Sequence, residues 1–180
     1  MKTYLSIDLD YWFANGDGDI NDLYRMLYTI SDRPSIIVDE HHHIKEHIDS
    51  FDVDRIIHID YHQDIVYPVN GSHFKIDCGN FFFFLKNRRD IDYEWYYPDI
   101  RCRTEGLCID ERYKPYSKKN FVFKSQTRKK GLPTLKSLKD VVAIGIACSY
   151  FYCFDVEEEI VNATRLYLNK LLSNCIDKTV

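Results

Sequence analysis

The sequence predicts an α/β fold in three layers, with helices on both faces of a mainly parallel sheet. Short apolar segments alternate with amphipathic ones along the chain, which is typical of parallel strands connected by helices. Polar clusters follow three of the apolar segments directly, where α/β proteins place their ligands. No boundary or internal repeat divides residues 1–180, so we expect a single domain.

Apolar periodicity and chain-breaking residues define the expected elements. Strands are expected over residues 3–9, 35–38, 55–59, 91–97, 121–124 and 141–147. A helix is expected after the cap residue Asp19, with an inner face made of Ile20, Leu23, Leu27 and Ile30. Residues 41–48 have helical spacing, and residues 81–85 are hydrophobic enough for either a helix or a strand. Asp155 and Glu158 are expected to open a last helix, with an inner face made of Val156, Ile160, Ala163, Tyr167 and Leu171.

Composition argues against a membrane or secreted protein. The chain is 45% hydrophobic, but it contains no apolar run long enough to cross a bilayer. Its first residues lack the apolar region and the cleavage site of a signal peptide, so we expect a cytoplasmic protein. The six cysteines are scattered without a CxxC pair, which is typical of thiols that stay reduced.

Charge is unevenly distributed along the chain. The net charge is only −4, yet residues 112–139 contain ten Lys or Arg and no Asp or Glu. Such a block can bind an acidic peptide or a nucleic-acid backbone, or it can be a solvated loop. Few aromatic residues interrupt the block, so a stacking surface for nucleic acid is not expected.

Three polar clusters follow expected strands and carry the residues best suited to chemistry. They contain Asp8 and Asp10 after the first strand, His41, His42 and His43 after the second, and Asp60, His62 and Asp64 after the third. Because alternate residues at a strand end point to the same side, the acids of a cluster can converge on one crevice. These carboxylates would repel one another without a cation, and a carboxylate-rich set with histidine suits Mn²⁺ or a comparable divalent ion. The sequence therefore predicts a metal site.

Each cluster also has a purely structural interpretation. The Asp-x-Asp of Asp8 and Asp10 is often a turn or a cap when it stands alone. One of the three adjacent histidines can be a ligand while the others lie at the surface, and His43 with His47 could form a separate zinc site on one helix face. All seven histidines nevertheless lie within residues 41–73, and this concentration favours a functional site.

Two of the clusters resemble the metal motifs of arginases and related ureohydrolases. Residues 57–64 (IHIDYHQD) resemble their Asp-Ala-His-x-Asp motif, and residues 6–10 (SIDLD) are similar to their Ser-x-Asp-x-Asp motif. Residues 38–41 (VDEH) and 77–80 (DCGN) resemble the Glu-His and Gly-Asn segments of a smaller related group that includes the peptide arginases. Those enzymes convert arginine residues of ribosomally made precursor peptides to ornithine and release urea. The resemblance covers about the first 90 residues and implies an arginase-like fold of reduced size.

The resemblance implies a centre of two Mn²⁺ ions. One ion would be held by His41, Asp60, Asp64 and Asp8, and the other by His62, Asp60, Asp8 and Asp10. Asp60 and Asp8 would bridge the two ions, and Asp64 would thus belong to the catalytic centre. A hydroxide between the metals would attack the guanidinium carbon of an arginine-containing peptide substrate. The two motifs occur in the reverse of the order found in ordinary arginases, and a permuted strand order would account for this.

Further catalytic and substrate-binding residues are expected around the metals. His73 is the candidate proton shuttle, with His42 as the alternative. Asn80 is expected either to contact the substrate backbone or to cap the segment that follows it. The carboxylate that binds the guanidinium group would be one of three acids: Asp77, Glu94 or Glu105.

Three other functions are consistent with the same residues. A deacetylase of the arginase-like superfamily would cleave an amide with an Asp-x-His set around one zinc ion. A phosphotransferase of the haloacid-dehalogenase type would use the Asp-x-Asp after the first strand, although Trp12 stands where that family usually has Thr or Val. A non-enzymatic, metal-stabilised peptide-binding module would use the basic residues 112–139 as its contact surface.

Overall fold

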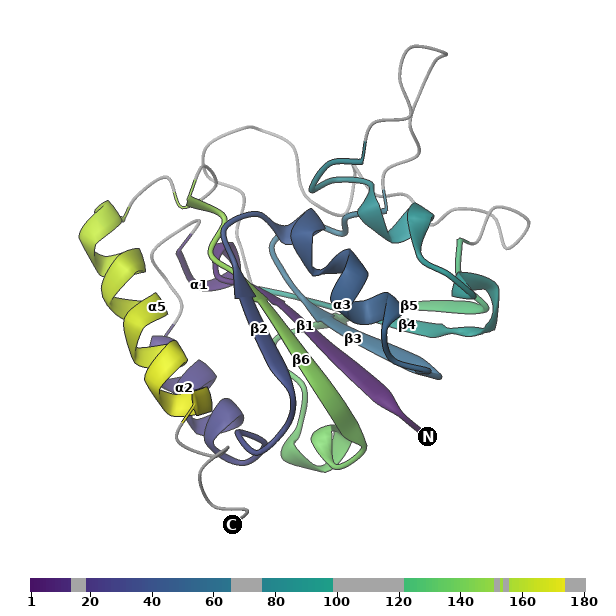
Figure 1. Ribbon diagram of the computed structural model, residues 1–180, viewed down its shortest axis with the longest axis horizontal. Helices are drawn as coiled ribbons and strands as arrows, with labels where there is room; N and C mark the ends of the chain where they lie inside the picture. The colour runs from purple at the N-terminus through teal and green to yellow at the C-terminus, as the bar shows by residue number, and fades with distance from the viewer. Residues whose placement is uncertain (14–18, 66–75, 99–121, 151–152, 154–155, 174–180) are drawn as a thin grey trace.

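The computed structural model describes residues 1–13, 19–65, 76–98, 122–150, 153 and 156–173 (Figure 1). One six-stranded sheet forms its centre, and every pair of neighbouring strands is parallel. The strands are β1 (Thr3–Asp8), β2 (Ser35–Val38), β3 (Arg55–Ile59), β4 (Asp92–Tyr97), β5 (Ser125–Lys130) and β6 (Val141–Ala147). Their order across the sheet is β2-β6-β1-β3-β4-β5, and the expected α/β fold with a parallel sheet is confirmed.

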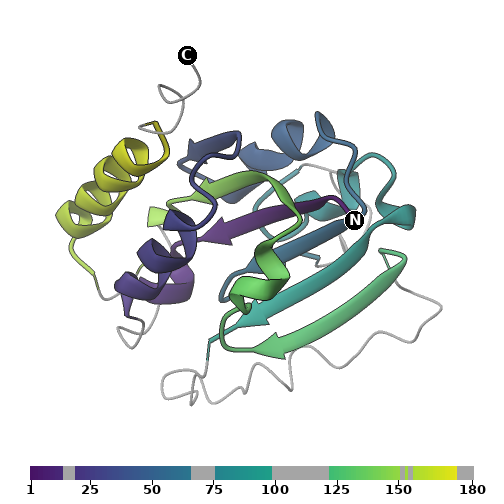
Figure 2. The ribbon, with the colours of Figure 1, turned by 90° about the horizontal axis from the view of Figure 1, so that it is seen from below.

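Helices pack against both faces of the sheet (Figures 1 and 2). The helices on one face are α2 (Ile20–Tyr28) and α5 (Glu158–Ser173), whose apolar residues join Leu5 and Ile7 of β1 in one buried cluster. The other face is covered by the 3₁₀ helix η1 (His41–Ile44), α3 (Lys45–Asp49) and the 3₁₀ helix η2 (Phe81–Phe84). Tyr4 of β1 belongs to the buried cluster on that side. Alternate residues of β1 therefore serve opposite cores, as expected for a strand buried on both faces.

Short helices connect several strands to the layers. α1 (Asp10–Phe13) follows β1 directly, and two further 3₁₀ helices are η3 (Arg88–Asp90) and η5 (Leu135–Leu138). Asp19 caps α2 as expected, because its side chain accepts a hydrogen bond from the Asn21 amide. None of the helices in the described part of the chain is long and apolar enough to cross a membrane.

The strand expected over residues 121–124 is wrong in position. The strand at this edge of the sheet is β5, and it begins at Ser125. Val122 and Phe123 precede it and are buried in the core, so their hydrophobicity reflects packing and not strand pairing. β5 itself is polar, which is typical of an edge strand in a soluble sheet.

The inner face expected for the last helix is rotated by about one residue, although Val156 and Leu171 of that expected face are partly buried against the core. The residues of α5 that are buried are Val161, Thr164, Leu168 and Leu172. Ile160 and Tyr167 are each 49% exposed, although Tyr167 packs against Tyr24 of α2. Apolar residues lie on both stripes of this helix, so the hydrophobic pattern alone does not fix its rotation. The expected cap residue Asp155 lies outside the described residues.

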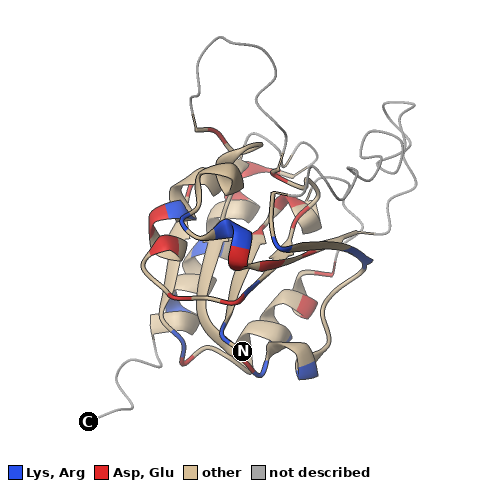
Figure 3. Cartoon of the chain, turned by 90° about the vertical axis from the view of Figure 1, so that its right-hand side faces the viewer, with Lys and Arg blue, Asp and Glu red and all other residues tan. Residues whose placement is uncertain are grey.

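Lys and Arg positions alternate with acidic ones on the side of the molecule shown in Figure 3. Within the described part of the basic segment, Lys129 of β5 pairs with Glu94 of β4 at 2.8 Å, and Lys124 lies 3.7 Å from Asp92. The acids of β4 therefore neutralise part of the basic charge that the sequence concentrates there. Residues 112–121 of the basic segment lie outside the described ranges.

Gly145 in β6 lets η1 approach the sheet closely. A Cβ atom at this position would lie 2.4 Å from Tyr4 Oη and 3.1 Å from Ile44 Cγ2. Contacts this short force neighbouring groups to move, so only glycine fits without a shift. Because η1 begins at His41, the close approach at Gly145 also helps to position His41, one of the predicted metal ligands.

Candidate metal centre

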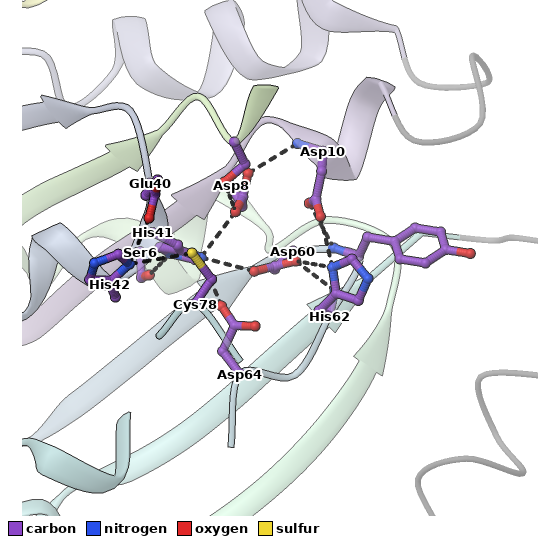
Figure 4. Close-up of polar contacts among 12 residues, drawn as sticks. Ser6, Asp8, Asp10, Glu40, His41, His42, Asp60, His62, Asp64 and Cys78 are labelled. Carbon is purple, nitrogen blue, oxygen red and sulfur yellow. Dashed lines mark hydrogen bonds and ion pairs between the residues drawn. The ribbon is translucent and has the colours of Figure 1, made fainter. Parts of the chain in front are cut away.

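The carboxyl ends of neighbouring parallel strands bring the predicted ligands together (Figure 4). Asp8 ends β1, His41 opens η1 after β2, and Asp60 follows the last residue of β3. β1 pairs with β3 on one side and with β6 on the other, and β6 also pairs with β2. The residues that follow these strands therefore meet at one edge of the sheet, as ligand-binding residues do in α/β folds.

His41 is the centre of the first group of ligand atoms. Its Nδ1 lies 3.2 Å from Asp8 Oδ2, 3.0 Å from Asp60 Oδ2 and 2.9 Å from Asp64 Oδ2. All four residues are buried. Asp8 at the end of β1 and two acids of the loop after β3 thus converge on a single ring nitrogen. Of these acids, Asp60 and Asp64 form a set of mutually close ligand atoms with His41.

Three of these converging atoms have no hydrogen-bond partner within the described residues: His41 Nδ1, Asp60 Oδ2 and Asp64 Oδ2. Buried polar atoms without a partner are rare, because each loses its hydration without compensation. Here the three atoms face one another at ion-pair distances of 2.9 and 3.0 Å, about the separation of two ligands that share a metal ion. A divalent cation among them would satisfy all three, so the residues fit the metal that the sequence predicts.

A chain of hydrogen bonds determines which nitrogen of His41 can bind a metal. His58 Nε2 lies 3.1 Å from the His62 carbonyl oxygen, and since a carbonyl only accepts, His58 Nε2 donates. Burial lowers the pKa of His58 to about 3, so its ring is neutral and its Nδ1 accepts from Ser6 Oγ at 3.3 Å. Because the single O–H of Ser6 is used in this bond to His58, its oxygen accepts a hydrogen bond from His41 Nε2 at 2.8 Å. When the His41 ring is neutral, it therefore keeps its proton on Nε2 and directs the lone pair of Nδ1 at the carboxylates.

The same carboxylates hold a proton on His41 when no cation is bound. Burial alone would lower the pKa of His41, but Asp60, Asp64 and Asp8 outweigh it and raise the pKa well above 6.5. A cation at Nδ1 would displace this proton and take over its interactions with the acids. Metal and proton therefore compete for one position in the centre.

A second group of ligand atoms lies next to the first and shares Asp60 with it. Asp10, Asp60 and His62 each offer one atom within 4.8 Å of the others. His62 Nδ1 lies 2.9 Å from Asp10 Oδ2 and 3.7 Å from Asp60 Oδ1. The two oxygens of Asp60 thus face different histidines, and this carboxylate belongs to both groups of ligand atoms.

Crowding changes the proton affinity of the acids. Burial raises the pKa of Asp8, and the charge of Asp10 adds to the shift. Burial together with the charge of Asp60 raises the pKa of Asp10 to about 7 and that of Asp64 to about 6. Burial lowers the pKa of His62, but the hydrogen bond and the charge of Asp10 more than reverse this and raise it to about 10. Without a cation, the centre therefore retains protons that a divalent ion would displace.

His58 is a member of the first group that sequence reasoning missed. Its Nε2 lies 3.2 Å from Asp60 Oδ2, and it forms a possible metal-binding set with His41, Asp60 and Asp64. Because Nε2 already donates to the His62 carbonyl, we assign His58 to positioning His41 and not to metal ligation. Its signal was in the sequence: His58 is two residues before Asp60 and so points to the same side of β3.

Ser149 is a second residue that the sequence did not reveal. It follows β6, and its hydroxyl donates a short hydrogen bond of 2.5 Å to Asp8 Oδ2. Ser149 and Asp64 both have left-handed backbone conformations, with φ of 41° and 53°. Non-glycine residues in this region are uncommon and gather at functional sites, where surrounding contacts hold them in place.

Two aromatic residues of β4 hold the loop that carries Asp60 and Asp64. Trp95 Nε1 donates to the Asp60 carbonyl oxygen at 2.9 Å, and the Tyr93 hydroxyl donates to the Gln63 carbonyl oxygen at 2.6 Å. Both aromatic side chains are fully buried. The loop is therefore attached to the core at two points of its backbone.

The other predicted site residues make contacts of their own or fall outside the described ranges. Asp77 and Asn80 form a turn, in which Asn80 Oδ1 accepts from the Asp77 amide at 3.0 Å and Asp77 Oδ1 accepts from the Gly79 amide at 3.0 Å. Glu94 pairs with Lys129. His73 and Glu105 fall among residues that the structure does not describe, and a role for Asn80 or Asp77 in substrate binding stays a prediction.

The alternative shuttle and the cysteines can also be placed. His42 Nδ1 contacts Cys78 Sγ and Glu40 Oε2. His47, proposed to pair with His43, instead has its Nδ1 2.7 Å from the Tyr4 hydroxyl. Cys78, Cys148 and Cys153 are free, in agreement with the reduced thiols that the sequence predicts; Cys102, Cys108 and Cys175 are not described.

Comparison with protein-family models, curated proteins and solved structures finds no match for this chain. Function must therefore be argued from the centre itself. The arrangement offers two adjacent groups of hard oxygen and imidazole ligands that share one carboxylate. Such centres can bind and acidify water and can stabilise the charge of a hydrolytic transition state.

Proposed function

We propose that the chain is a hydrolase with two divalent metal ions, and that it acts as a peptide arginase on arginine residues of a precursor peptide. The observation that carries the proposal is the convergence of His41 Nδ1, Asp60 Oδ2 and Asp64 Oδ2, three buried atoms without a hydrogen-bond partner among the described residues. The group of Asp10 and His62 beside them, joined through Asp60, supports a second ion. We further propose that the sheet is an arginase-like fold of reduced size.

The strand order supports the arginase resemblance despite the reversed order of the two motifs. β1 carries Asp8 at its end, β3 precedes Asp60, and these strands are direct neighbours in the sheet. The two motifs therefore lie side by side whichever comes first in the chain. A permuted connection between the same neighbouring strands would give the same centre.

The proposed function gives each residue of the centre a role. Asp8, Asp60 and Asp64 with His41 would hold one ion, and Asp10, Asp60 and His62 would hold the other. When bound, divalent ions supply a water of lowered pKa as the nucleophile near neutral pH. The acidic surroundings would attract a cationic guanidinium group. The exposed portion of His62, 35% of its side chain, places this residue at the accessible side of the centre.

A mass-spectrometric assay tests the proposal. The protein would be incubated with Mn²⁺ and an arginine-containing peptide, and we expect the mass decrease of arginine-to-ornithine conversion together with an equal amount of urea. Asp10→Asn and His62→Ala should abolish turnover, whereas Glu46→Gln on the exposed face of α3 should not change it. Absence of urea and of any amide product with peptide, free arginine and agmatine would rule the proposal out.

An amide hydrolase with a single metal ion is the second candidate. The group around His41 is completely buried, whereas the second group contains the partly exposed His62, so the two positions differ in how tightly they enclose an ion. A stoichiometry near one, with zinc preferred and an acetylated lysine peptide cleaved, would favour this candidate over the arginase.

A further inference from the structure

Exposed apolar side chains gather on the surface that α2 and α5 form together. Six large hydrophobic side chains are exposed within the described residues, and four of them belong to these two helices: Tyr28, Ile160, Leu166 and Tyr167. Tyr24, one turn before Tyr28 on α2, packs against Tyr167 of α5 with ring centroids 4.4 Å apart, so the two helices present one continuous surface (Figures 1 and 2). Exposed apolar side chains that gather in one place are typical of an interaction site.

One row of side chains along α5 combines apolar surface with charge. The row consists of Glu159, Ala163, Leu166 and Lys170, and all four are exposed. Their spacings of four, three and four residues place them in one line along the same side of the helix. Glu159 and Lys170 stand at the two ends of this row, three helical turns apart, and neither forms an ion pair with another described residue. The charges at both ends are therefore available to a partner.

The row is complementary to a copy of itself that runs in the opposite direction. If two such helices pair antiparallel about a two-fold axis between positions 164 and 165, position 159 faces position 170 of the other copy. Glu159 of each copy would then face Lys170 of the other, so opposite charges meet on both sides of the axis. Ala163 would face Leu166 in the same way. A small side chain opposite a large one lets the two helices approach closely.

This symmetry favours a second copy of the chain over an unrelated partner. An isologous interface requires each residue to be compatible with its counterpart at the same distance on the other side of the axis. Glu159 and Lys170 meet this requirement by charge, and Ala163 and Leu166 meet it by size. An unrelated partner would need an apolar surface but would not need opposite charges at equal distances from one point of the helix.

We propose that the chain forms a two-fold symmetric dimer in which α5 of one copy pairs antiparallel with α5 of the other. The dimer would give both apolar stripes of α5 a role, because Leu168 packs in the core of its own chain and Leu166 would pack against the second copy. Ile160 and Tyr167 flank the row on the side of α2 and would be partly covered by the same contact. The proposed interface contains no residue of the candidate metal centre, so it does not depend on the proposed reaction.

Sedimentation equilibrium of the full chain tests whether the dimer forms. We expect twice the mass of one chain for the wild type, and a monomer for Leu166→Glu. Leu135→Glu is the matched control, because Leu135 is also apolar and exposed but lies on η5; it should leave the dimer intact. Both side chains are exposed, so neither substitution places a charge in the core, and circular dichroism should show unchanged helix content. A monomeric wild type, or a dimer that survives Leu166→Glu, would overturn the proposal.

Charge reversal tests the antiparallel arrangement itself. Glu159→Lys and Lys170→Glu should each raise the dissociation constant about 10-fold or more, because two attractive pairs become two repulsive ones. An equal mixture of the two variants should associate as tightly as the wild type, since every pair across the axis again has opposite charges. The double variant Glu159→Lys with Lys170→Glu should dimerise for the same reason. If the single variants keep wild-type affinity, or if the mixture does not recover it, these two residues do not face each other and the proposed pairing is wrong.

Discussion

Ser6 of β1 lies directly opposite His58 of β3, and its hydroxyl group stands between two imidazole rings. Ser6 Oγ is 2.8 Å from His41 Nε2 and 3.3 Å from His58 Nδ1. This single hydroxyl couples the orientations of the two rings, because once its one proton is donated to His58 it can only accept from His41. Hydrogen bonds that connect β1, β3 and η1 therefore orient the His41 ring that faces the carboxylates.

The first prediction concerns this hydroxyl. Ser6→Ala should weaken metal binding about 10- to 100-fold, because His41 loses the acceptor that holds its proton on Nε2. Isothermal titration with Mn²⁺ measures the change, and Ser31→Ala serves as a control, since Ser31 Oγ bonds to the Tyr28 carbonyl at the end of α2. Equal affinities for Ser6→Ala and the wild type would show that the hydrogen-bond chain does not position His41.

The second prediction is that metal stabilises the protein more as pH rises from about 5 to 8. The pKa of Asp64 is raised to about 6 and that of Asp10 to about 7, so these groups stabilise the metal-free fold below their unfolded pKa of 3.8. That contribution is lost as pH rises through the folded values. A divalent ion binds the deprotonated acids, and its stabilising effect therefore grows over the same interval.

Melting temperatures with Mn²⁺ and with a chelator, recorded at several pH values, measure this difference. Using the difference between the two conditions cancels titration elsewhere in the chain. An increment that stays constant or decreases between pH 5 and 8 would contradict the competition between metal and protons.

The sequence predicts the convergence of the six acids and histidines because it depends on a simple property of parallel sheets. Residues after buried strands meet at one edge once the strands are known, and the positions of Asp8, His41 and Asp60 follow from three short apolar segments. The chain order of the strands does not matter for this argument. What matters is which strands are neighbours in the sheet, and β1 pairs with β3 on one side and with β6 on the other.

Contacts made across long sequence separations could not be predicted in this way. Ser149 reaches Asp8 across 141 positions, and nothing local marks that serine as different from others. Trp95 and Tyr93 hold the loop that carries Asp60 and Asp64 only because β4 lies next to β3. The rotation of α5 was missed for a related reason: its apolar residues form two stripes, and tertiary packing selects the one that contains Leu168.

The third prediction concerns the close approach of η1. Gly145→Ala should lower the free energy of unfolding by about 1–3 kcal/mol, because the added methyl group would overlap Tyr4 Oη and Ile44. Urea denaturation measures the loss, and metal affinity should fall as well, since η1 carries His41. Gly79→Ala is the matched control, because its Cβ would meet only Asp77 Oδ1 at 3.6 Å. Tyr4→Phe should restore part of the stability of Gly145→Ala, and no recovery would mean that Tyr4 is not the obstacle.

The fourth prediction concerns the hydrogen bonds that attach the loop of Asp60 and Asp64 to β4. Tyr93→Phe deletes only the hydroxyl that donates to the Gln63 carbonyl, and it leaves that buried oxygen with one hydrogen bond fewer. We expect a loss of about 1–3 kcal/mol in the free energy of unfolding, together with weaker Mn²⁺ binding because Asp64 follows Gln63. Tyr150→Phe is the comparison, since that hydroxyl bonds to Asn162 at the exposed surface and its removal should leave metal affinity unchanged. If Tyr93→Phe lowers stability without any change in metal affinity, the hydrogen bond supports the core alone and Asp64 is positioned by its own backbone.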